Sequence, residues 1–543
     1  MKNLSSFEPK IVCTLPALRS LVIWLACLIL LASFTSGIHA QKKSASSRAR
    51  KLPSAEKIVG DYLKATGGKK RQAAIKDATY EWEIQSNGRA VGGERKFVKA
   101  PVSTRSEIAV NEGAGGDVQG VSAVSARSAW RRTENQGVRT LTDAEADADR
   151  LAAALDASRL IEYKKLNVLA RTVAYDETLA EPAYVVEFST KRGARLRYWF
   201  GAASKLLLKT QNQASGKGAL FGDYRAGRGG VLEPHSKTLT SEGQPDVKLA
   251  LRSVSYDTGL SDALFDPPAE TEALDIPALL REVEANQKEI DERVSNYSFT
   301  EKRTEREISG KGELKKEKVT VSEIYPLLGG GTVQRLISEN GVPLSAERAA
   351  KQDKEIAETV AKYEREREKR EIKRQEEARK GKKDDDDVGI TIFLRACEFL
   401  SPRRERLRDR EAVVFDFRPR PGFKPNGTAE SIVSKLSGVV WIDPADKTVM
   451  RLEAKLAESY KIAGGLFASI RPGSAFVFEQ TRMADGVWLP RFMQLNFAAK
   501  ILLFKGIEAN ETREFSDYRR FDTEASDYKL GAPAAKAPAP PNQ

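Results

Sequence analysis

Two stretches of the chain alternate apolar and polar residues, and each leads into a similar segment that contains a tryptophan. "AYVVEF" (183–188) precedes "RLRYWFGAASKLLLKTQ" (195–211), and "AVVFDF" (412–417) precedes "GVVWIDPADKTVMRLEAK" (438–455). Alternation that uses β-branched and aromatic residues predicts strands of an antiparallel sheet. The similarity between the two stretches indicates that the chain contains one structural unit twice.

The repeat extends beyond these strands. When Trp199 is aligned with Trp441 without gaps, Lys205 falls on Lys447 and Lys209 falls on Arg451. "GVLEP" then matches "GVWLP", and "YDTGLSD" matches "FDTEASD", in the same order. Four matched segments in one order predict a duplicated unit.

Each half also begins with an amphipathic segment that has helix-start and helix-stop signals. Residues 54–68 start at a serine N-cap candidate and end at two glycines, and residues 276–297 repeat the apolar spacing. Alternating strands joined by Gly or Asn turns follow at 78–101 and 297–326, which predicts a meander. A further helix is expected at 143–158. Each unit is therefore expected to be a helix followed by a strongly curved antiparallel sheet.

A charged insertion interrupts the second unit at 344–388. Basic and acidic residues are equally numerous in it, and many lie four residues apart, as in a solvated helix. It has no sustained apolar seam of the coiled-coil type. We expect an exposed charged helical arm that contributes almost nothing to a core, with docking of a partner as the alternative.

The length and the first residues set the overall organisation. A chain of 543 residues is too long for one core. Residues 1–40 combine basic residues, the apolar run "LVIWLACLILLASF" and a small residue, Ala40, which is typical of a secretory signal peptide. We expect cleavage after Ala40, a linker at 41–53, units at 54–270 and 275–528, and a disordered tail at 529–543. Export across the inner membrane to the periplasm follows from the signal.

Export leaves one cysteine and one histidine. Only Cys397 remains, so an internal disulfide is excluded, and we expect it to be a small buried apolar residue. The lone histidine, His235, excludes a histidine cluster, and we expect it at the surface or in a turn. No nucleotide-binding, zinc-protease or nucleophile-elbow motif occurs, and no carboxylate pair stands out by its spacing. We therefore expect no catalytic residues, no metal and no cofactor.

The net charge of +13 allows an anionic membrane surface as a partner, whereas nucleic acid is not expected outside the cytoplasm.

"SAEKIVGDYLKATGG" (54–68), "AYVVEF" and the two tryptophan segments resemble the LolA/LolB-like superfamily of outer-membrane lipoprotein-sorting proteins. The resemblance implies that each unit is an incomplete antiparallel β-barrel covered by helices. The family's carriers have a single domain, whereas the repeat predicts an α+β fold with two such barrels in tandem. The resemblance also implies a hollow that holds a hydrophobic small molecule or a lipoprotein acyl chain. Gly201 and Ala202 stand where the second unit has Asp443 and Pro444, so the first turn departs from the family pattern.

The candidate ligand-binding residues lie on the predicted strand faces and the first helix. They are Ile58, Tyr62, Tyr184, Val186, Phe188, Trp199, Phe415, Phe417 and Trp441. The same residues could simply fill a core, and that alternative stays open here. The rival functions are an envelope module that binds a protein by its sheet face or charged arm, and a hydrolase that uses carboxylates.

Overall fold

The structure is a computed structural model that describes residues 52–520. Within that range it leaves out 87, 111–117, 270–273, 295–296, 310–312, 328–331, 380–389, 463–467 and 502–506. The expected signal peptide, nearly all of the linker and the tail lie outside the described residues. In the described part of the chain, every helix is too short or too polar to cross a bilayer.

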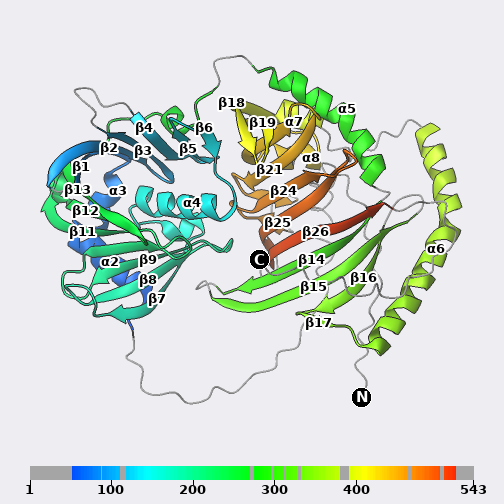
Figure 1. The fold of residues 1–543 in the computed structure, drawn as a ribbon, viewed down its shortest axis with the longest axis horizontal. Coiled ribbons are helices and arrows are strands. Elements are labelled where there is room, and N and C mark those ends of the chain that lie inside the picture. The colour runs from blue at the N-terminus through cyan, green and yellow to red at the C-terminus, as the bar shows by residue number, and fades with distance from the viewer. Residues whose placement is uncertain are drawn as a thin grey trace.

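The first half of the chain forms one 13-stranded antiparallel sheet (Figure 1). Strands β1 to β6 follow one another on one side and β7 to β13 on the other, and the two series join where β1 pairs with β13. The sheet is open, with β6 and β7 at its edges. Its strands are β1 Asp77–Ser86, β2 Arg89–Lys99, β3 Ser103–Val110, β4 Val118–Val124, β5 Ala129–Thr133, β6 Gly137–Thr140, β7 Leu169–Asp176, β8 Ala183–Ser189, β9 Arg195–Gly201, β10 Leu207–Asn212, β11 Gly218–Ala226, β12 Leu232–Ser241 and β13 Gln244–Tyr256.

Three helices and three 3₁₀ turns accompany this sheet. They are α2 Ala55–Ala65, α3 Lys69–Ala74, α4 Asp143–Ala157, η1 Tyr163–Leu166, η2 Arg228–Gly230 and η3 Asp262–Phe265. The predicted first helix is confirmed: Ser54 caps it by accepting a hydrogen bond from Lys57 N, and Gly67 follows it with a φ of +115°. The predicted helix at 143–158 is confirmed as α4, whereas α3 was not predicted.

The second half forms another 13-stranded antiparallel sheet. As in the first sheet, the first strand pairs with the last, here β14 with β26. The strands are β14 Tyr297–Ile308, β15 Leu314–Pro326, β16 Thr332–Glu339, β17 Val342–Pro343, β18 Cys397–Leu407, β19 Arg410–Pro419, β20 Leu436–Asp443, β21 Thr448–Leu456, β22 Tyr460–Ile462, β23 Ala468–Ile470, β24 Ala475–Arg482, β25 Trp488–Ile501 and β26 Ile507–Arg520. Its helices are α5 Ile276–Val294, α6 Ala346–Arg379, α7 Ile390–Ala396 and α8 Thr428–Val433. The sheet-rich antiparallel fold expected from the sequence is confirmed.

The two aligned tryptophan turns have the same local geometry in spite of their different sequences. Lys205 and Lys447 both adopt left-handed φ angles, +61° and +50°. In the second turn Asp443 Oδ1 accepts hydrogen bonds from the backbone of residues 445 and 446. In the first turn Glu181 Oε1 takes this role by accepting from residues 203 and 204. A carboxylate from the preceding loop thus replaces the missing aspartate.

The residues that cover the tryptophan rings also correspond. Lys209 lies with its Nζ 4.7 Å from the Trp199 ring centroid, and Arg451 lies with its guanidinium carbon 5.9 Å from that of Trp441. These are the pairs that the gapless alignment matches. A cation over an aromatic face is attractive in both places.

The charged helix α6 differs from the expected free arm. Ile356 and Tyr363 are buried against Leu327 and Val333 of the second sheet, and Val360 packs beside them. Gln352 bonds the backbone of residue 336, and Arg335 forms an ion pair with Asp353. The expectation that this segment contributes almost no apolar surface was therefore wrong for the first half of the helix. Ile356, Val360 and Tyr363 have the spacing of one helix face, but this face spans only about two turns and stands among many charged residues, which is why the sequence pattern concealed it.

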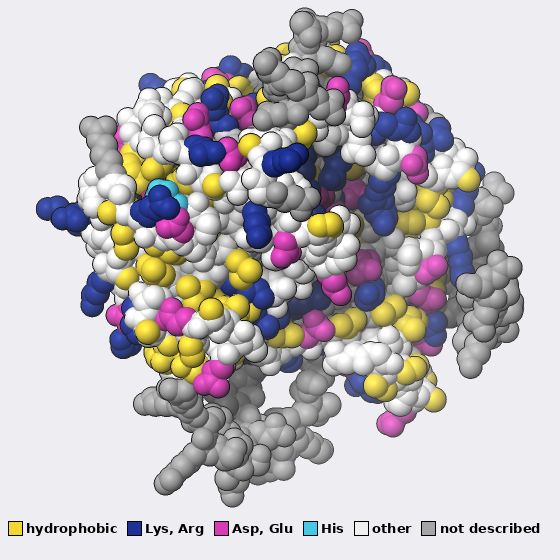
Figure 2. Space-filling model, turned by 60° about the vertical axis from the view of Figure 1, so that its left-hand side comes forward, with side chains coloured by type: hydrophobic (Ala, Val, Ile, Leu, Met, Phe, Trp, Pro, Cys, Tyr) yellow, Lys and Arg dark blue, Asp and Glu magenta, His cyan; other side chains and the backbone are white. Residues whose placement is uncertain are grey.

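Cys397 and His235 test two smaller expectations. Cys397 is a free, fully buried thiol, as predicted, and burial raises its pKa to about 12. His235 lies in strand β12, not in a turn, and its Nδ1 is 3.1 Å from the carbonyl oxygen of Glu233. Basic, acidic and apolar side chains are interspersed over the face of the molecule in Figure 2.

Candidate functional site

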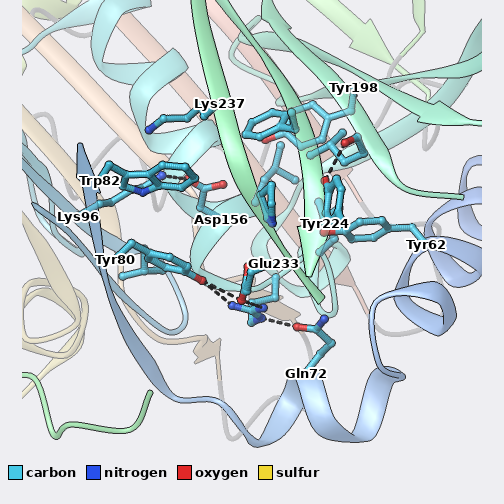
Figure 3. A pocket seen from close by; sticks show the side chains of 17 residues that line it. Tyr62, Gln72, Tyr80, Trp82, Lys96, Asp156, Tyr198, Tyr224, Glu233 and Lys237 are labelled. Carbon is cyan, nitrogen blue, oxygen red and sulfur yellow. Dashed lines mark hydrogen bonds and ion pairs between the residues drawn. The ribbon is translucent and has the colours of Figure 1, made fainter. Parts of the chain in front are cut away.

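A hollow of about 150 Å³ lies in the first half, between the sheet and the helices that cover it (Figure 3). Its walls come from α2, α3 and the end of α4, and from strands β1, β2 and β9 to β12. A cavity of this size can hold a molecule as large as benzene. The lining residues are Tyr62, Gln72, Tyr80, Trp82, Lys96, Val98, Leu155, Asp156, Arg159, Leu160, Tyr198, Leu207, Phe221, Tyr224, Glu233, Pro234 and Lys237.

Strand alternation supplies the aromatic part of this wall. Tyr80 and Trp82 are two residues apart on β1, so both side chains point to the same face of the sheet. Tyr198 on β9 pairs with Val186 on β8 and faces the helices in the same way. Tyr62 approaches from α2, and its ring centroid lies 5.4 Å from that of Phe200. The hollow is therefore walled by aromatic rings from both the sheet and a helix.

A closed polar network forms one end of the hollow. Arg159 donates to Glu233 Oε1 at 2.6 Å and to Tyr80 Oη at 2.9 Å, and it also bonds the side chain of Gln72. Tyr256 donates to the same Glu233 oxygen at 2.7 Å. Burial alone would lower the pKa of Arg159, but Tyr80 and Glu233 raise it, so the guanidinium stays charged. The donors and acceptors of these side chains are therefore satisfied within the network.

Two further ion pairs line the opposite side. Lys96 Nζ lies 2.6 Å from Asp156 Oδ2, and Lys237 Nζ lies 2.6 Å from Glu94 Oε2. Lys237 also sits 4.7 Å from the centroid of the Trp82 ring. Burial lowers the pKa of Lys237, and the adjacent Lys96 adds to this, whereas Glu94 opposes it. Since each cation has a carboxylate, this wall offers no excess charge to a ligand.

The unpaired polar groups of the hollow are phenol hydroxyls. Among the described residues, neither Tyr62 nor Tyr198 has a hydrogen-bond partner for its hydroxyl. Tyr198 is only 6% exposed, and burial raises its pKa well above the usual value. Burial likewise raises the pKa of Tyr62 to about 12. Both hydroxyls therefore remain protonated at neutral pH and can donate to an acceptor placed inside the hollow.

The first-half residues singled out by the sequence lie around this hollow but mostly behind its wall. Ile58, Val186 and Phe188 are buried in one cluster, and Tyr184 packs against it. Tyr62 belongs to the edge of that cluster and also lines the hollow. Trp199 lies on the other face of the sheet, with Val185.

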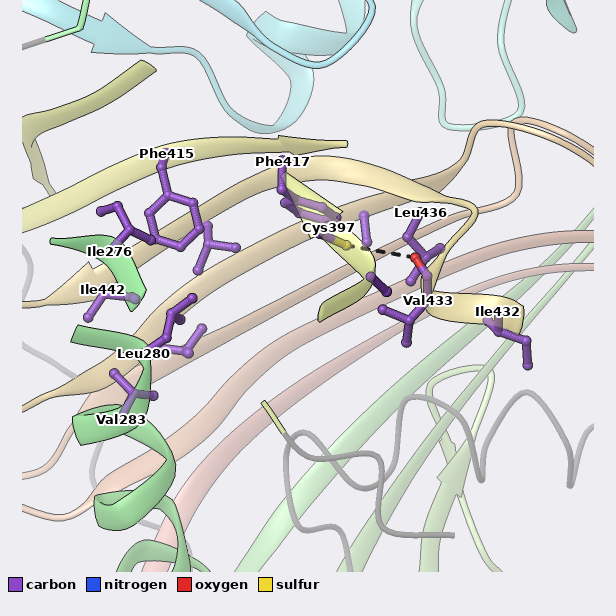
Figure 4. Close-up of a cluster of buried hydrophobic side chains, with 14 of the residues drawn as sticks. Ile276, Leu280, Val283, Cys397, Phe415, Phe417, Ile432, Val433, Leu436 and Ile442 are labelled. Carbon is purple, nitrogen blue, oxygen red and sulfur yellow. Dashed lines mark hydrogen bonds between the residues drawn. The ribbon is translucent and has the colours of Figure 1, made fainter. Parts of the chain in front are cut away.

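The second-half candidates lie in densely packed surroundings. Phe415 and Phe417 are at most 1% exposed and pack under α5, α7 and α8, together with Ile276 and Leu280 of α5 (Figure 4). Trp441 lies on the opposite face, with Val414 and Trp488. Whether any of these faces admits a ligand stays a prediction.

The second half contains a smaller hollow at the edge of this cluster, with a volume of about 40 Å³. Its walls are apolar, with Leu436, Leu456 and Phe497 among them. Ser474 and Asn496 are the polar members of this otherwise apolar wall, and both atoms of the Asn496 side-chain amide are buried without a hydrogen-bond partner among the described residues. There is room here for a few atoms only.

The sequence contained some but not all of the signals for this site. The alternating "ATYEWE" segment (78–83) places Tyr80 and Trp82 on one face. The choice of Tyr198 over its neighbour Trp199 needed the strand faces that only the structure shows. No pattern indicated Arg159, which follows α4 with a left-handed φ of +50°. In the described ranges, no group of three or more metal-ligating side chains comes together. The arrangement can bind an amphiphile by burial, stacking and hydrogen bonding.

Comparison of the sequence with known protein families finds no match, and comparison with curated proteins finds none either. Among solved structures, a putative outer membrane lipoprotein-sorting protein domain from Vibrio parahaemolyticus is 14% identical over 39% of this chain and 97% of its own, with a TM-score of 0.28. A DUF1329 family protein from Desulfovibrio piger is 14% identical over 39% and 96%, also at 0.28. A LolA superfamily protein from Nitrosomonas europaea is 12% identical over 40% and 99%, again at 0.28.

Proposed function

We propose that this chain is a non-catalytic cell-envelope protein that binds a hydrophobic ligand, such as a lipid or a lipoprotein acyl chain. The ligand would occupy the hollow of the first half. In this proposal the chain is exported by residues 1–40 and works in the periplasm. Its two units, 54–270 and 275–528, are tandem incomplete barrels covered by helices, and α6 belongs to an insertion in the second.

The observation that carries the proposal is the aromatic hollow itself, with its two unpaired phenol hydroxyls. Each methylene buried there would contribute about 0.8 kcal/mol. The paired charges around it favour an uncharged part of the ligand, because an additional buried charge would lack a partner. The Tyr62 and Tyr198 hydroxyls would donate to a neutral acceptor, such as an ester or amide carbonyl.

The proposal is tested by binding of the uncharged fluorescent probe N-phenyl-1-naphthylamine to the mature protein. Leu207→Trp places a large ring at the wall of the hollow and is expected to reduce probe affinity at least about tenfold. Leu220→Trp is the matched control, since Leu220 is 37% exposed on the adjacent strand and does not line the hollow. Native mass spectrometry followed by extraction would identify what the protein carries from the cell.

Equal affinity of both variants would place the probe elsewhere and contradict the proposal. A protein that never retains an amphiphile would favour the alternative function, an envelope module that binds another protein by its sheet face or by the charged helix.

A further inference from the structure

The seam between the two halves is built largely from charged side chains. Helix α4 lies on the side of the first sheet that faces the second (Figure 1), and Asp143 and Arg150 of this helix bond Arg451 and Glu453 of β21. Loops and strand ends of the first half reach β18 and β19 in the same way. Ser128 donates to Asp416 at 2.7 Å, and the backbone N–H of Thr140 donates to Glu405 at 2.7 Å.

Lys455 stands apart from this pairing. It follows Arg451 and Glu453 at intervals of two on β21, so its side chain points to the same seam. The pairing of residues 453 to 455 with β20 is regular, so no bulge turns it away. Within the described ranges, Lys455 has neither a hydrogen-bond nor an ion-pair partner.

The arginines around Lys455 are themselves partly paired, because Arg192 donates to Asp147 at 2.9 Å and Arg127 forms an ion pair with Asp266. Burial, together with the positive charges of Arg150 and Arg192, lowers the pKa of Lys455 to about 7, and Arg127 acts in the same direction. The carboxylate of Glu453 opposes this effect. Its own side chain is already bound by Arg150 at 3.2 Å and by Arg451 at 2.8 Å.

Two of these guanidinium groups have donors to spare. The Nε atoms of Arg127 and Arg150 are buried and have no hydrogen-bond partner in the part of the chain that the structure describes. Arg127 Nε lies 3.8 Å from Asp416 Oδ2, which is too far for a hydrogen bond. A buried donor without an acceptor is costly, and such groups in a native protein call for an explanation such as a bound ion.

We propose that the seam binds a phosphate-type oxyanion through Lys455 and the free Nε–H groups of Arg127 and Arg150. A tetrahedral anion presents several acceptor oxygens at once, so it can satisfy donors that come from two halves of the chain. Arginine and lysine are the side chains that usually recognise phosphate. The anion would be a free phosphate or the phosphomonoester head group of a lipid. The site is separate from the hollow of the first half, and it does not depend on the function proposed for that hollow.

The test measures the melting temperature of the mature protein in increasing inorganic phosphate, with ionic strength held constant by sodium chloride. A second arm measures co-sedimentation with phosphatidylcholine vesicles, with or without phosphatidic acid. Stabilisation by phosphate identifies a soluble anion, and retention only by vesicles that contain phosphatidic acid identifies a lipid head group. Either result supports the site.

Lys455→Met is expected to weaken the response at least about tenfold, and Lys455→Arg to retain most of it. Lys455→Met should fold, because it removes a half-buried cation that has no partner. Lys424→Met, at an exposed lysine of the same half, is the matched control and should behave as the parent protein does. The proposal is overturned if neither arm responds, or if Lys455→Met and the parent respond equally.

Discussion

In both halves the first strand of the sheet pairs with the last, but the helix–sheet interfaces of the two halves are filled differently. In the second half Phe415, Phe417 and Phe497 interlock with α5, α7 and α8, and the hollow beside them measures only about 40 Å³. In the first half a hollow of about 150 Å³ remains, and Tyr62, Tyr80, Tyr198 and Tyr224 line it. Tyrosine, lysine and arginine have polar ends that cannot be packed as freely as phenylalanine.

The contrast shows that alternation alone does not distinguish a core from a site. Val186 and Phe188 of the first half and Phe415 and Phe417 of the second are all at most 1% exposed. The difference lies in the residues that line the hollow of the first half. There Arg159 bonds both Glu233 and the hydroxyl of Tyr80, and so holds the aromatic wall in place. A polar network can thus hold open a space that apolar side chains would otherwise close.

The largest expected effect is the unfolding of the second half when a charged side chain is placed in its core. Phe415→Asp should destabilise the protein by more than about 4 kcal/mol, because an unpaired carboxylate would be fully buried. The same change at the half-buried Tyr62, whose side chain borders the hollow, should cost less than half as much, since a carboxylate there can reach water. Thermal melting and circular dichroism of the two variants provide the comparison. Equal losses would mean that the two interfaces are packed alike.

The second prediction concerns alkaline pH. Burial raises the pKa of Tyr62 to about 12, and it also raises the pKa values of Tyr80, Tyr198 and Tyr224. The unfolded chain releases these protons near pH 10, so the free energy of unfolding falls as the pH rises above 10. One such tyrosine contributes up to about 1.4 kcal/mol per pH unit. We expect the first half to unfold before the second.

Brief subtilisin digestion at increasing pH, with fragments mapped by mass spectrometry, would show which half is cut first. The second half has fewer such tyrosines, chiefly Tyr325 and Tyr518. Tyr198→Phe should move the first-half transition to higher pH. Earlier cutting of the second half would contradict the comparison.

The smallest expected effect belongs to a single hydroxyl. Tyr198→Phe removes a group that has no partner within the described residues, so we expect a stability change within about 0.5 kcal/mol. Affinity for a ligand with a carbonyl acceptor should fall by about fivefold, in line with the loss of one hydrogen bond. Displacement of N-phenyl-1-naphthylamine by methyl decanoate measures this, and affinity for the probe itself serves as the control. An unchanged displacement curve would show that the hydroxyl does not face the bound ligand.

Much of the fold follows from local signals in the sequence. The serine cap and the glycine stop define α2, and alternation defines β8, β9, β19 and β20. The pairing of β1 with β13 was not predicted, because it joins segments more than 150 residues apart in sequence. The docking of α6 was missed because Ile356 and Tyr363 stand among many charged residues.

The candidate site was predicted less completely than the fold. Tyr62 was identified because it lies on the apolar face of a predicted helix, but Trp199 was chosen over its neighbour Tyr198, which lines the hollow. Adjacent strand residues point to opposite faces, so a choice between neighbours depends on knowing which face the helices cover. The position of the Arg159 side chain depends on a left-handed backbone conformation just after α4, and no periodicity in the sequence reveals that conformation.

The charged seam also affects how the chain can be made. Thr140 and Glu405, which bond across it, are 265 residues apart in the sequence. Because the N-terminal part of the chain emerges first, the first half is complete while its partner surface is still missing. During that time the exposed flank of α4 presents Asp143, Asp147 and Arg150 to water, not an apolar patch. A polar flank of this kind is unlike the apolar surfaces that drive aggregation of incomplete chains. We therefore expect the first half to stay in solution until the second half folds against it.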